Sequence, residues 1–320
     1  MDKFLSCDWG TSSFRLRLVN VADEKVCKEI VTADGIAGTH QEWLKESALN
    51  EERLSFYQGF LLKQIKRLGV EAQANLAGVT VIVSGMASSS IGMIELPYKE
   101  LPLKIDGSDI PTHIIEQSTK FPHKLIVISG ARTGDDVLRG EETLLIGCDI
   151  ADLKEKSLWV FPGTHSKHIQ VVKDEAVSFK TYLTGEVFDL LSTRSILSNS
   201  VERNNLNEEQ TNNFFRRGIV EGASGNLLNT VFHVRTNQLF NKNTRAQNYH
   251  YLSGLLIGAE LKDIQDSSES VFLVSGDSLK KNYQQGIEML GFRNSVQCIN
   301  ADKAFVKGQL RIYQSFRSRN

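Results

Sequence analysis

The sequence predicts a two-domain α/β protein whose two halves begin with the same kind of turn. Leu5–Ser13 runs into Phe14–Leu18 and reads as a strand, a Gly-Thr turn and a second strand. Leu158–Lys167 runs into His168–Val172 and repeats that order. Apolar residues and arginines alternate along Phe14–Leu18, and this period of two is typical of a half-buried strand. The chain therefore contains two β-hairpins of one design, about 150 residues apart.

Turns of small residues suit phosphate binding, because no side chain prevents amides and hydroxyls from approaching the oxygens. Two such hairpins, one opening each half, resemble those of the actin–hexokinase–Hsp70 type of ATP-binding fold. That resemblance implies an actin-like ATPase fold, a duplicated ribonuclease H-like architecture. Its central mixed sheets are flanked by helices, and an interdomain cleft separates the domains. We place the domains at residues 1–150 and 151–320, with the boundary near the polar stretch Asp149–Lys156.

Composition excludes several other classes of protein. Hydrophobic content of 41% and charged content of 23% are those of an ordinary globular protein. A formal net charge of −1 gives no electrostatic case for nucleic acid or a membrane surface as partner. No apolar run is long enough to span a bilayer, and we expect no signal peptide. The cysteines lack paired spacing, which favours reduced thiols and a cytoplasmic location: Cys7, Cys27, Cys148 and Cys298.

The rest of the first half reads as alternating strands and helices. Lys25–Thr32 is predicted to be a third strand. Glu42–Leu68 is predicted to be one helix, because its apolar residues recur on one face. Gly78–Ser84 and Lys124–Ser129 are β-branched apolar runs, typical of buried parallel strands. A helix over residues 139–147 then leads to the second hairpin.

The second half repeats this alternation. Tyr251–Leu261 is predicted to be an apolar helix whose small residues permit close helix packing, a structural rather than a chemical role. The other predicted strands are Ala176–Leu183, Ser270–Val274 and an edge strand at Gln297–Ile299. The other predicted helices are 184–191, Glu208–Gly218, Gly222–Phe232, Leu279–Leu290 and a closing helix at Ala301–Phe316.

The order and spacing of short segments along almost the whole chain resemble the 2-keto-3-deoxygalactonate kinase family. The segments are Asp8–Ser12, Ser84–Met86 with Pro97-Tyr98, Arg139–Thr143, Pro162–Lys167, Thr184–Glu186 and Ser253–Glu260. The resemblance implies a carbohydrate kinase that uses ATP to phosphorylate 2-dehydro-3-deoxygalactonate on its C6 hydroxyl, giving 2-dehydro-3-deoxy-6-phosphogalactonate in galactonate catabolism. It implies ATP and Mg²⁺ as cofactors and a sugar acid as the small-molecule partner. It leaves a homodimer open.

Phosphoryl transfer needs positioning, charge stabilisation and usually Mg²⁺. Asp8 precedes the first turn, where its carboxylate can hold the metal, although an Asp there can also simply cap the turn. Arg15 faces either the cleft or solvent. We expect the phosphates to contact both turns and one lysine: Gly10, Thr11, Ser12, Ser13, Gly163, Thr164 and Lys167.

The second hairpin lacks the acidic residue that many proteins of this fold carry there, since Val160–Pro162 occupies the region. The nearest carboxylates are Asp135, Asp136, Glu141 and Glu142, and we take Asp136 as a second metal ligand. Residues 140–147 also resemble a helix of exopolyphosphatases in which a glutamate assists attack on phosphate. Glu141 or Glu142 can therefore accept the proton of the sugar hydroxyl. Adjacent helical residues diverge by about 100°, so only one should point inward.

An anionic sugar acid requires a cation or an amide-rich loop for its carboxylate. The candidates are Arg139, Arg132 and the loop Gly85–Ser90; the predicted substrate-binding residues are Gly85, Met86, Ser88, Arg139 and His165. For the adenosine we take Gly276 and Ser278, although Ser278 can equally be a helix N-cap. Glu186 either caps its helix or faces the cleft.

Two other functions on the same fold compete with the kinase. An exopolyphosphatase-like phosphohydrolase would release phosphate without a sugar, but the extended motif match and the lack of excess basic charge count against it. A non-catalytic sugar or nucleotide sensor would bind without turnover, whereas Asp8, Glu141 and Glu142 are retained. A Rossmann dehydrogenase is disfavoured, since no Gly-x-Gly-x-x-Gly follows the first strand.

Overall fold

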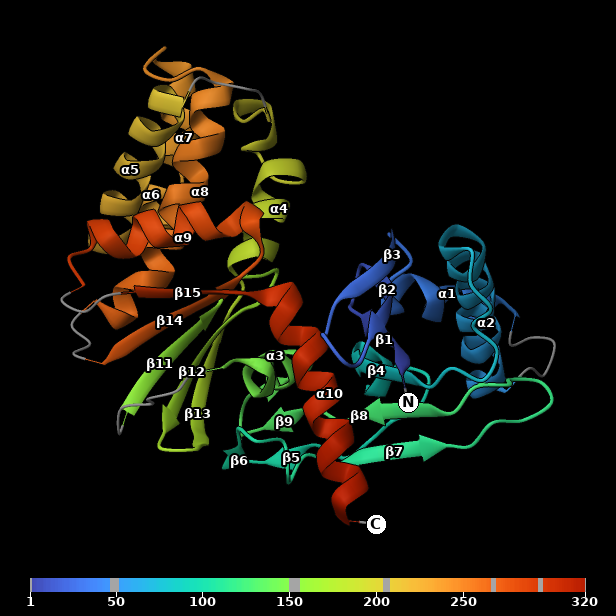
Figure 1. Cartoon of the computed structure of the whole chain (residues 1–320). Coiled ribbons are helices and arrows are strands. Elements are labelled where there is room, and N and C mark those ends of the chain that lie inside the picture. Colours follow the sequence, from blue (N-terminus) through green and yellow to red (C-terminus); the bar gives the residue numbers. More distant parts are fainter. Residues whose placement is uncertain are drawn as a thin grey trace. The chain divides into compact units, whose positions relative to one another are not determined.

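The computed structural model describes residues 2–46, 52–149, 156–203, 208–265, 269–292 and 296–319 (Figure 1). The chain forms two compact units. The first comprises Met1–Asp152, Asp174–Ser178 and Ala301–Asn320, and the second comprises Leu153–Lys173 and Phe179–Asn300. The predicted division assigned residues 301–320 to the second domain, but in the structure they cluster with the first unit. Most of the predicted boundary, residues 150–155, lies outside the described residues.

The first unit is built on a six-stranded mixed sheet of order β3-β2-β1-β4-β8-β7. β1, β2 and β3 are antiparallel, β1, β4 and β8 are parallel, and β7 returns antiparallel to β8. This is the mixed sheet that the sequence predicts. The strands are β1 Lys3–Trp9, β2 Phe14–Asn20, β3 Val26–Thr32, β4 Val81–Gly85, β7 Thr112–Ile115 and β8 Leu125–Ile128.

Two helices, α1 (Ile36–Glu46) and α2 (Arg53–Ala72), accompany this sheet (Figure 1). The prediction of one helix over Glu42–Leu68 is wrong, because Glu52 has an extended backbone and α2 begins only after it. The core between α2 and the sheet is aromatic: the Trp9 ring lies 5.1 Å from Phe14 and stacks on Phe60 at the same distance. These aromatic contacts hold Trp9, the last residue of β1, against α2.

The start of α1 holds the first hairpin turn. The amides of Ile36 and Ala37 donate to the carbonyls of Gly10 and Thr11 at 2.9 and 3.0 Å. Gly35 makes this approach feasible, since a Cβ there would lie 2.3 Å from the Thr11 carbonyl oxygen. The helix therefore fixes the backbone of the turn and leaves its outer side to other partners.

The first unit also contains short strands that the sequence did not predict. β5, β9 and β10 form a three-stranded sheet of order β10-β9-β5. Strands of two residues carry no periodic signal, which explains why sequence patterns cannot reveal them. Their bounds are β5 Lys99–Glu100, β9 Ala131–Arg132 and β10 Val137–Leu138; β6, at Leu103–Lys104, pairs with Glu175 and Ala176.

The last helix, α10 (Ala301–Arg319), crosses α3 (Glu141–Gly147) at two glycines (Figure 1). A Cβ on Gly147 would lie 1.7 Å from the Ala304 carbonyl oxygen, and one on Gly308 would lie 1.9 Å from that of Thr143. Beside this crossing, the buried Gln309 side chain donates to the Cys7 and Ile82 carbonyls at 3.0 and 3.2 Å. These contacts explain why α10 belongs to the first unit.

The glycine crossing makes a testable prediction. Gly308→Ala should lower the free energy of unfolding by about 3 kcal/mol, because an added methyl must push two helices apart. Gly59→Ala is the matched control: Gly59 is exposed in α2 and has no atom within 4 Å of an added Cβ. That change should raise stability by about 0.5–1 kcal/mol. Urea unfolding of both variants measures the difference, and equal stabilities would contradict the close crossing.

The second unit contains a sheet of order β15-β14-β11-β12-β13, with β11 antiparallel to β12 and parallel to β14. The first residues of β13 cluster with the first unit, where they pair with β6. The predicted second hairpin is confirmed as β11 and β12. The strands are β11 Lys156–Phe161, β12 Ser166–Val172, β13 Glu175–Tyr182, β14 Ser270–Ser275 and β15 Val296–Asn300.

Helices α5, α8 and α9 cover one face of this sheet with an apolar core (Figure 1). The predicted close packing of the apolar helix α8 is confirmed: a Cβ on Gly254 would lie 2.1 Å from the Phe215 carbonyl oxygen of α5. The predicted helix Gly222–Phe232 is wrong, because α5 continues to Ser224 and Asn226 caps a new helix, α6. The helices are α4 Thr184–Thr193, α5 Glu208–Ser224, α6 Leu227–Thr230, α7 His233–Leu239, α8 Arg245–Leu261 and α9 Asp277–Met289.

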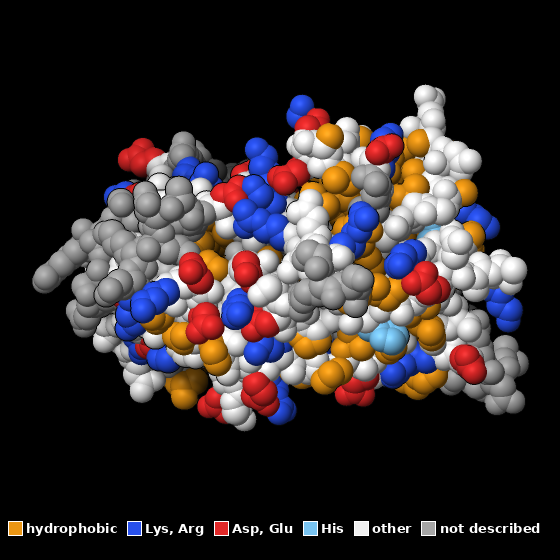
Figure 2. All heavy atoms as spheres, turned by 60° about the horizontal axis from the view of Figure 1, so that its bottom comes forward, with side chains coloured by type: hydrophobic (Ala, Val, Ile, Leu, Met, Phe, Trp, Pro, Cys, Tyr) orange, Lys and Arg blue, Asp and Glu red, His pale blue; other side chains and the backbone are white. Residues whose placement is uncertain are grey.

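The surface shows no division by charge on the face drawn in Figure 2, where Lys and Arg side chains lie among Asp and Glu side chains. This mixing agrees with the net charge of −1. None of the helices in the described ranges combines the length and apolar character needed to cross a bilayer.

Candidate active site

The first predicted phosphate-binding turn, residues 10–13, is a tight turn in the first unit. The Gly10 amide donates to the Ser13 carbonyl at 2.9 Å, and Trp9 pairs with Phe14 across the hairpin. Thr11, Ser12 and Ser13 are exposed. The turn therefore presents three hydroxyl groups on a backbone that α1 holds in place.

Asp8 lies beside this turn among charged side chains. Its nearest charged partner is Arg15, directly opposite on β2, with Nη1 3.9 Å from Oδ2. In the described residues the Asp8 carboxylate accepts no backbone hydrogen bond, so the structure does not support a turn-capping role. Burial raises the pKa of Asp8, and Arg15 and Arg17 partly offset the effect. The Asp8 side chain is 32% exposed, so its carboxylate remains accessible to a cation.

Arg15 and Arg17 are themselves paired with other carboxylates. Arg17 is almost fully buried and donates to Glu29 and to Asp302, at the start of α10. Arg15 donates to Asp302 at 3.1 Å. The Arg15 side chain is 35% exposed and lies among Asp8, Glu29 and Asp302, so its choice between the cleft and solvent stays a prediction.

A second group of predicted residues gathers at the end of β4. Arg139 donates through Nη1 to the Ser88 hydroxyl and through Nε to the Tyr98 hydroxyl at 2.9 Å. Gly85 precedes the short 3-10 helix Met86–Ser88 and has a φ of 90°, which an L-residue with a side chain rarely adopts. Because β4 pairs in parallel with β1, Gly85 lies opposite Trp9, next to Asp8. The guanidinium of Arg139 is thus held in place by two side-chain hydroxyls.

The two glutamates at the start of α3 differ as helix geometry requires. Glu142 is 1% exposed; the Gly140 amide donates to its two carboxyl oxygens at 2.9 and 2.8 Å, and the Thr143 hydroxyl donates at 3.1 Å. Glu141 instead accepts a hydrogen bond from the Arg139 amide at 3.1 Å. Only Glu142 points inward.

Burial shifts the titration of Glu142. Desolvation, reinforced by the charge of Glu141, raises the pKa of Glu142 to about 7. Hydrogen bonds from Gly140 and Thr143 lower the pKa but do not cancel the effect. A carboxyl group with a pKa near 7 is suited to act as a general base at neutral pH. Gly140, whose amide binds the Glu142 carboxyl, lies near Gly85, since a Cβ on Gly140 would lie 3.8 Å from the Gly85 Cα.

Asp136 lies in the turn between β9 and β10, and Arg132 is the last residue of β9. The Asp136 carboxylate accepts the Val137 amide at 2.7 Å, and the Arg132 guanidinium is paired with Glu100. Arg132 is therefore a weaker candidate than Arg139 for the substrate carboxylate. In the described ranges no group of three or more His, Cys, Asp or Glu side chains forms a metal-binding cluster.

The second turn lies in the second unit, at the start of α4. Gly185 packs directly on it, because a Cβ there would lie 2.5 Å from the Gly163 carbonyl oxygen. The Glu186 amide donates to the Thr164 carbonyl at 3.0 Å, and the Glu186 carboxylate is paired with His165. Glu186 is thus the acidic group that the structure brings to the second turn, where the sequence lacks one.

Lys167 and the predicted adenosine residues also lie in the second unit. The buried Lys167 ammonium donates to the Thr181 hydroxyl at 2.7 Å. Gly276 is the N-cap of α9, so Ser278 is the second helical residue rather than the cap. Because β14 is parallel to β11, Gly276 and the Gly163 turn follow neighbouring strands at the same edge of the sheet.

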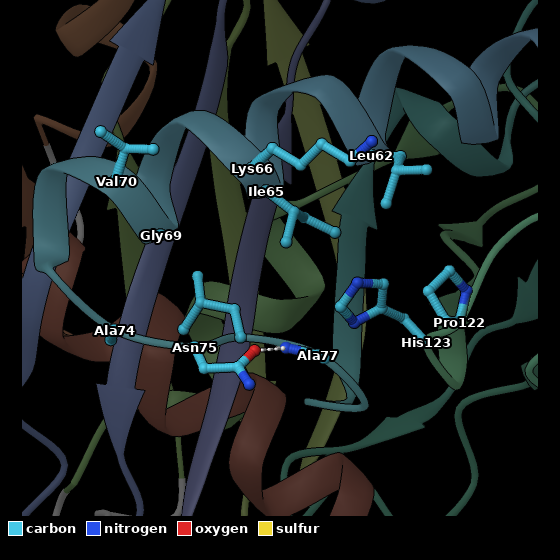
Figure 3. A pocket seen from close by; sticks show the side chains of 11 residues that line it. Leu62, Ile65, Lys66, Gly69, Val70, Ala74, Asn75, Ala77, Pro122 and His123 are labelled. Carbon is cyan, nitrogen blue, oxygen red and sulfur yellow. Dashed lines mark hydrogen bonds between the residues drawn. The ribbon is translucent and has the colours of Figure 1, made fainter.

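A groove in the first unit lies apart from all these residues (Figure 3). Its volume is about 440 Å³, and its mostly apolar lining comes from α2, the loop after it and Pro122-His123. His123 donates through Nδ1 to the Val79 carbonyl at 2.9 Å, and burial lowers the pKa of its ring. None of the predicted site residues lines the groove, so it is not part of the candidate site.

Comparisons with known proteins identify the family of the chain. The family model described as 2-keto-3-deoxy-galactonokinase matches residues 8–312. The 2-dehydro-3-deoxygalactonokinase of Escherichia coli K12 is 32% identical over 236 residues, covering 71% of this chain and 76% of the relative. The probable 2-dehydro-3-deoxygalactonokinase DgoK1 of Rhizobium meliloti 1021 is 30% identical over 321 aligned residues, covering 95% and 94% of the two chains.

Solved structures show the same similarity in three dimensions. A crystal structure from Sinorhizobium meliloti, provisionally assigned as a 2-dehydro-3-deoxygalactonokinase, aligns with a TM-score of 0.77 at 27% identity and covers 98% of this chain and 96% of that one. The activator of 2-hydroxyisocaproyl-CoA dehydratase from Clostridium difficile, solved with bound ADPNP, aligns with a TM-score of 0.50 at 10% identity, covering 99% and 97%. The second likeness concerns the fold alone.

Proposed function

Since the chain belongs to the 2-keto-3-deoxy-galactonokinase family, we propose that it transfers the γ-phosphoryl group of ATP to the C6 hydroxyl of 2-dehydro-3-deoxygalactonate. The chain is a carbohydrate kinase with the fold of actin-like ATPases and sugar kinases. The observation that carries the assignment of chemistry is the buried Glu142 carboxyl at the start of α3, where desolvation raises its pKa to about 7. The product is 2-dehydro-3-deoxy-6-phosphogalactonate, an intermediate of galactonate catabolism.

Residues of the first unit bind the sugar acid and accept its proton. Arg139, held by Ser88 and Tyr98, binds the substrate carboxylate by charge-assisted hydrogen bonds. Glu142 takes the proton of the hydroxyl as the oxygen attacks phosphorus. Gly85 and Met86 also contact the sugar. They begin the 3-10 helix that contains Ser88, the residue to which Arg139 donates.

Residues of both turns bind ATP. The exposed hydroxyls of Thr11, Ser12 and Ser13 donate to phosphate oxygens. In the second unit Gly163, Thr164 and Lys167 hold the phosphates, and we retain His165 as a candidate contact of the sugar acid. Gly276 and Ser278, which follow the neighbouring strand, bind the adenosine.

The donor chemistry near Asp8 fits Mg²⁺, because a partly exposed carboxylate just before a turn with three exposed hydroxyls offers the oxygen ligands that this ion prefers. Asp8 would hold the ion, and we retain Asp136 as a second, more distant candidate. Mg²⁺, when bound, neutralises phosphate charge during transfer. We also propose a cytoplasmic location, supported by four unpaired cysteines, and keep a homodimer as a proposal.

ADP release with Mg·ATP tests the function against a panel of 2-dehydro-3-deoxygalactonate, 2-dehydro-3-deoxygluconate, galactonate, glucose and buffer alone. We expect release that depends on a 2-keto-3-deoxy acid and is abolished by chelation of Mg²⁺. Release in buffer alone would favour an exopolyphosphatase-like phosphohydrolase. Nucleotide binding without turnover on any acceptor would favour a sensor.

The role of Arg139 makes a separate prediction. Arg139→Met should raise the KM for the sugar acid about 30- to 100-fold, because a pair of charge-assisted hydrogen bonds to its carboxylate is lost. The KM for ATP should change little. Arg132→Met is the matched control, since that guanidinium is already paired with Glu100. Steady-state kinetics would contradict the assignment if the two variants had the same KM for the sugar acid.

A further inference from the structure

A buried group of polar side chains lies beneath the second turn, and we call it the Glu260 cluster. It comprises Glu260 of α8, Ser166 and His168 of β12, Thr184 of α4 and Tyr283 of α9. His168 Nε2 and the Tyr283 hydroxyl lie 2.9 and 2.7 Å from the Glu260 carboxyl oxygens. The Thr184 hydroxyl contacts the same carboxylate, and Tyr283 lies 2.9 Å from the Ser166 hydroxyl. Four separate elements thus meet at one carboxylate.

Each hydrogen bond in the cluster has a defined direction. An ionised carboxylate only accepts, so His168, Thr184 and Tyr283 all donate to Glu260. Burial raises the pKa of the Tyr283 phenol, which keeps its proton for this bond. The phenol oxygen accepts from Ser166, whose own oxygen accepts the Gly163 amide at 3.4 Å. The series runs from the amide of Gly163 through Ser166 and Tyr283 to Glu260.

His168 fits the same directions. Its Nδ1 has no hydrogen-bond partner among the described residues, and the side chain is 2% exposed. Its Nε2 faces the Glu260 carboxylate, which only accepts, so this nitrogen carries a proton. His168 therefore donates to Glu260 and is one of the groups that surround this carboxylate.

The cluster reaches the second turn by two routes. One route is the hydrogen-bonded series to the Gly163 amide. The other passes through Thr184, the first residue of α4, because the next residue, Gly185, packs on Gly163 and Thr164. A buried charge is costly unless several donors surround it, and here three donors do so. Apolar side chains would fill this site without the free-energy cost of a buried charge, so the carboxylate is consistent with a role other than packing.

We infer that Glu260 is a positioning residue of the nucleotide site, which holds the Gly163–Ser166 turn and the start of α4 in the geometry that binds phosphate. The inference rests on the proposed function, because that function makes ATP the ligand of the Gly163–Ser166 turn. One consequence is specific: because the Gly163 amide donates to Ser166, Gly163 serves phosphate binding through the position of its turn and not through its own amide. Tyr283 also belongs to α9, so its bond to Glu260 connects the cluster to the helix whose N-cap, Gly276, is proposed to bind the adenosine.

The chain offers a matched pair of variants for the test. Tyr283→Phe removes the phenol that joins the turn to Glu260. Tyr251→Phe removes an equivalent bond from a buried phenol to the Glu221 carboxylate, in the same unit but without a link to the turn. We measure the affinity for Mg·ADP by calorimetry, without sugar acid, and the stability of each variant by thermal unfolding.

Tyr283→Phe should weaken Mg·ADP binding about tenfold, the effect of one hydrogen bond to a charged group, whereas Tyr251→Phe should leave the affinity unchanged. Ser166→Ala should weaken binding similarly, and the double variant Ser166→Ala/Tyr283→Phe no further, because both belong to one series. Hydrogen exchange supplies a readout without any ligand: the Gly163 amide should lose protection in both single variants.

Equal Mg·ADP affinities of the Tyr283→Phe and Tyr251→Phe proteins would overturn the inference, as would additive effects of Ser166→Ala and Tyr283→Phe. If Tyr283→Phe fails to fold, Ser166→Ala alone decides, since it leaves Glu260 and its three donors in place. Wild-type protein that binds Mg·ADP but releases no ADP with the sugar acid would refute the proposed substrate and leave this test intact. Wild-type protein that binds no Mg·ADP would overturn both the ATP assignment and the inference.

Discussion

Replacing Glu142 by glutamine should lower kcat for sugar-acid phosphorylation by about 10²-fold or more and leave Mg·ATP binding unchanged. The amide has nearly the same shape as the carboxylate and can still accept the Gly140 amide and the Thr143 hydroxyl, so the start of α3 should persist. It cannot take a proton from the sugar hydroxyl. Pre-steady-state and steady-state kinetics with 2-dehydro-3-deoxygalactonate measure the loss at the chemical step.

Glu141→Gln is the control that the sequence itself supplies. Its carboxylate faces the Arg139 amide and Glu142 is the buried member of the pair, so the change should cost only a few-fold in kcat. A larger loss in Glu141→Gln than in Glu142→Gln would reverse the assignment. Near-normal turnover in both variants would remove the general base from this helix altogether.

The pH dependence of the wild-type enzyme provides a second readout for Glu142. Because the base must be ionised, kcat/KM should rise with pH up to about 7 and then level off. Stability should change in the opposite direction. The folded protein holds a proton that the unfolded chain releases near pH 4.5, so the free energy of unfolding falls by about 3 kcal/mol between pH 4.5 and 7. Glu142→Gln should lack both dependences.

The hairpins could be predicted from sequence because their determinants are local. Alternating side chains define β1, β2, β11 and β12, and glycine permits each turn, so all the information lies within about 20 residues. The divergence of Glu141 and Glu142 also follows from the helix period alone. Which of the two is buried, however, depends on the fold around α3, and that required the structure.

The remaining features depend on contacts between distant segments. Gly35 matters only because the start of α1 meets the first turn, and Gln309 only because α10 returns to β1 and β4. Tyr98 lies in a recognised motif, but its hydrogen bond to Arg139 spans 41 residues. Glu260 was assigned to a packing helix, which is correct for its glycines and incomplete for its carboxylate. Periodicity identifies the buried face of a helix and does not identify the partners of a charge on it.

Asp8→Asn should lower kcat by about 10²- to 10³-fold and at the same time leave the protein at least as stable as the wild type at neutral pH. Burial raises the pKa of Asp8, so its ionised form costs free energy in the folded state, and a neutral amide avoids that cost. Arg15 at 3.9 Å and the buried Arg17 recover only part of it.

A turn-capping role and a metal-binding role of Asp8 predict opposite effects of Asp8→Asn on stability, so the variant distinguishes the two roles. If Asp8 served the turn, Asp8→Asn would lower the Tm and leave kcat near normal, but its carboxylate accepts no backbone amide in the described residues. If Asp8 holds Mg²⁺, the variant should need a higher Mg²⁺ concentration for half-maximal activity, and its affinity for ADP should lose most of its dependence on Mg²⁺. Calorimetric titration of ADP with and without Mg²⁺ measures that dependence directly. An unchanged Mg²⁺ requirement together with a lowered Tm would assign Asp8 to the fold and move the metal site elsewhere.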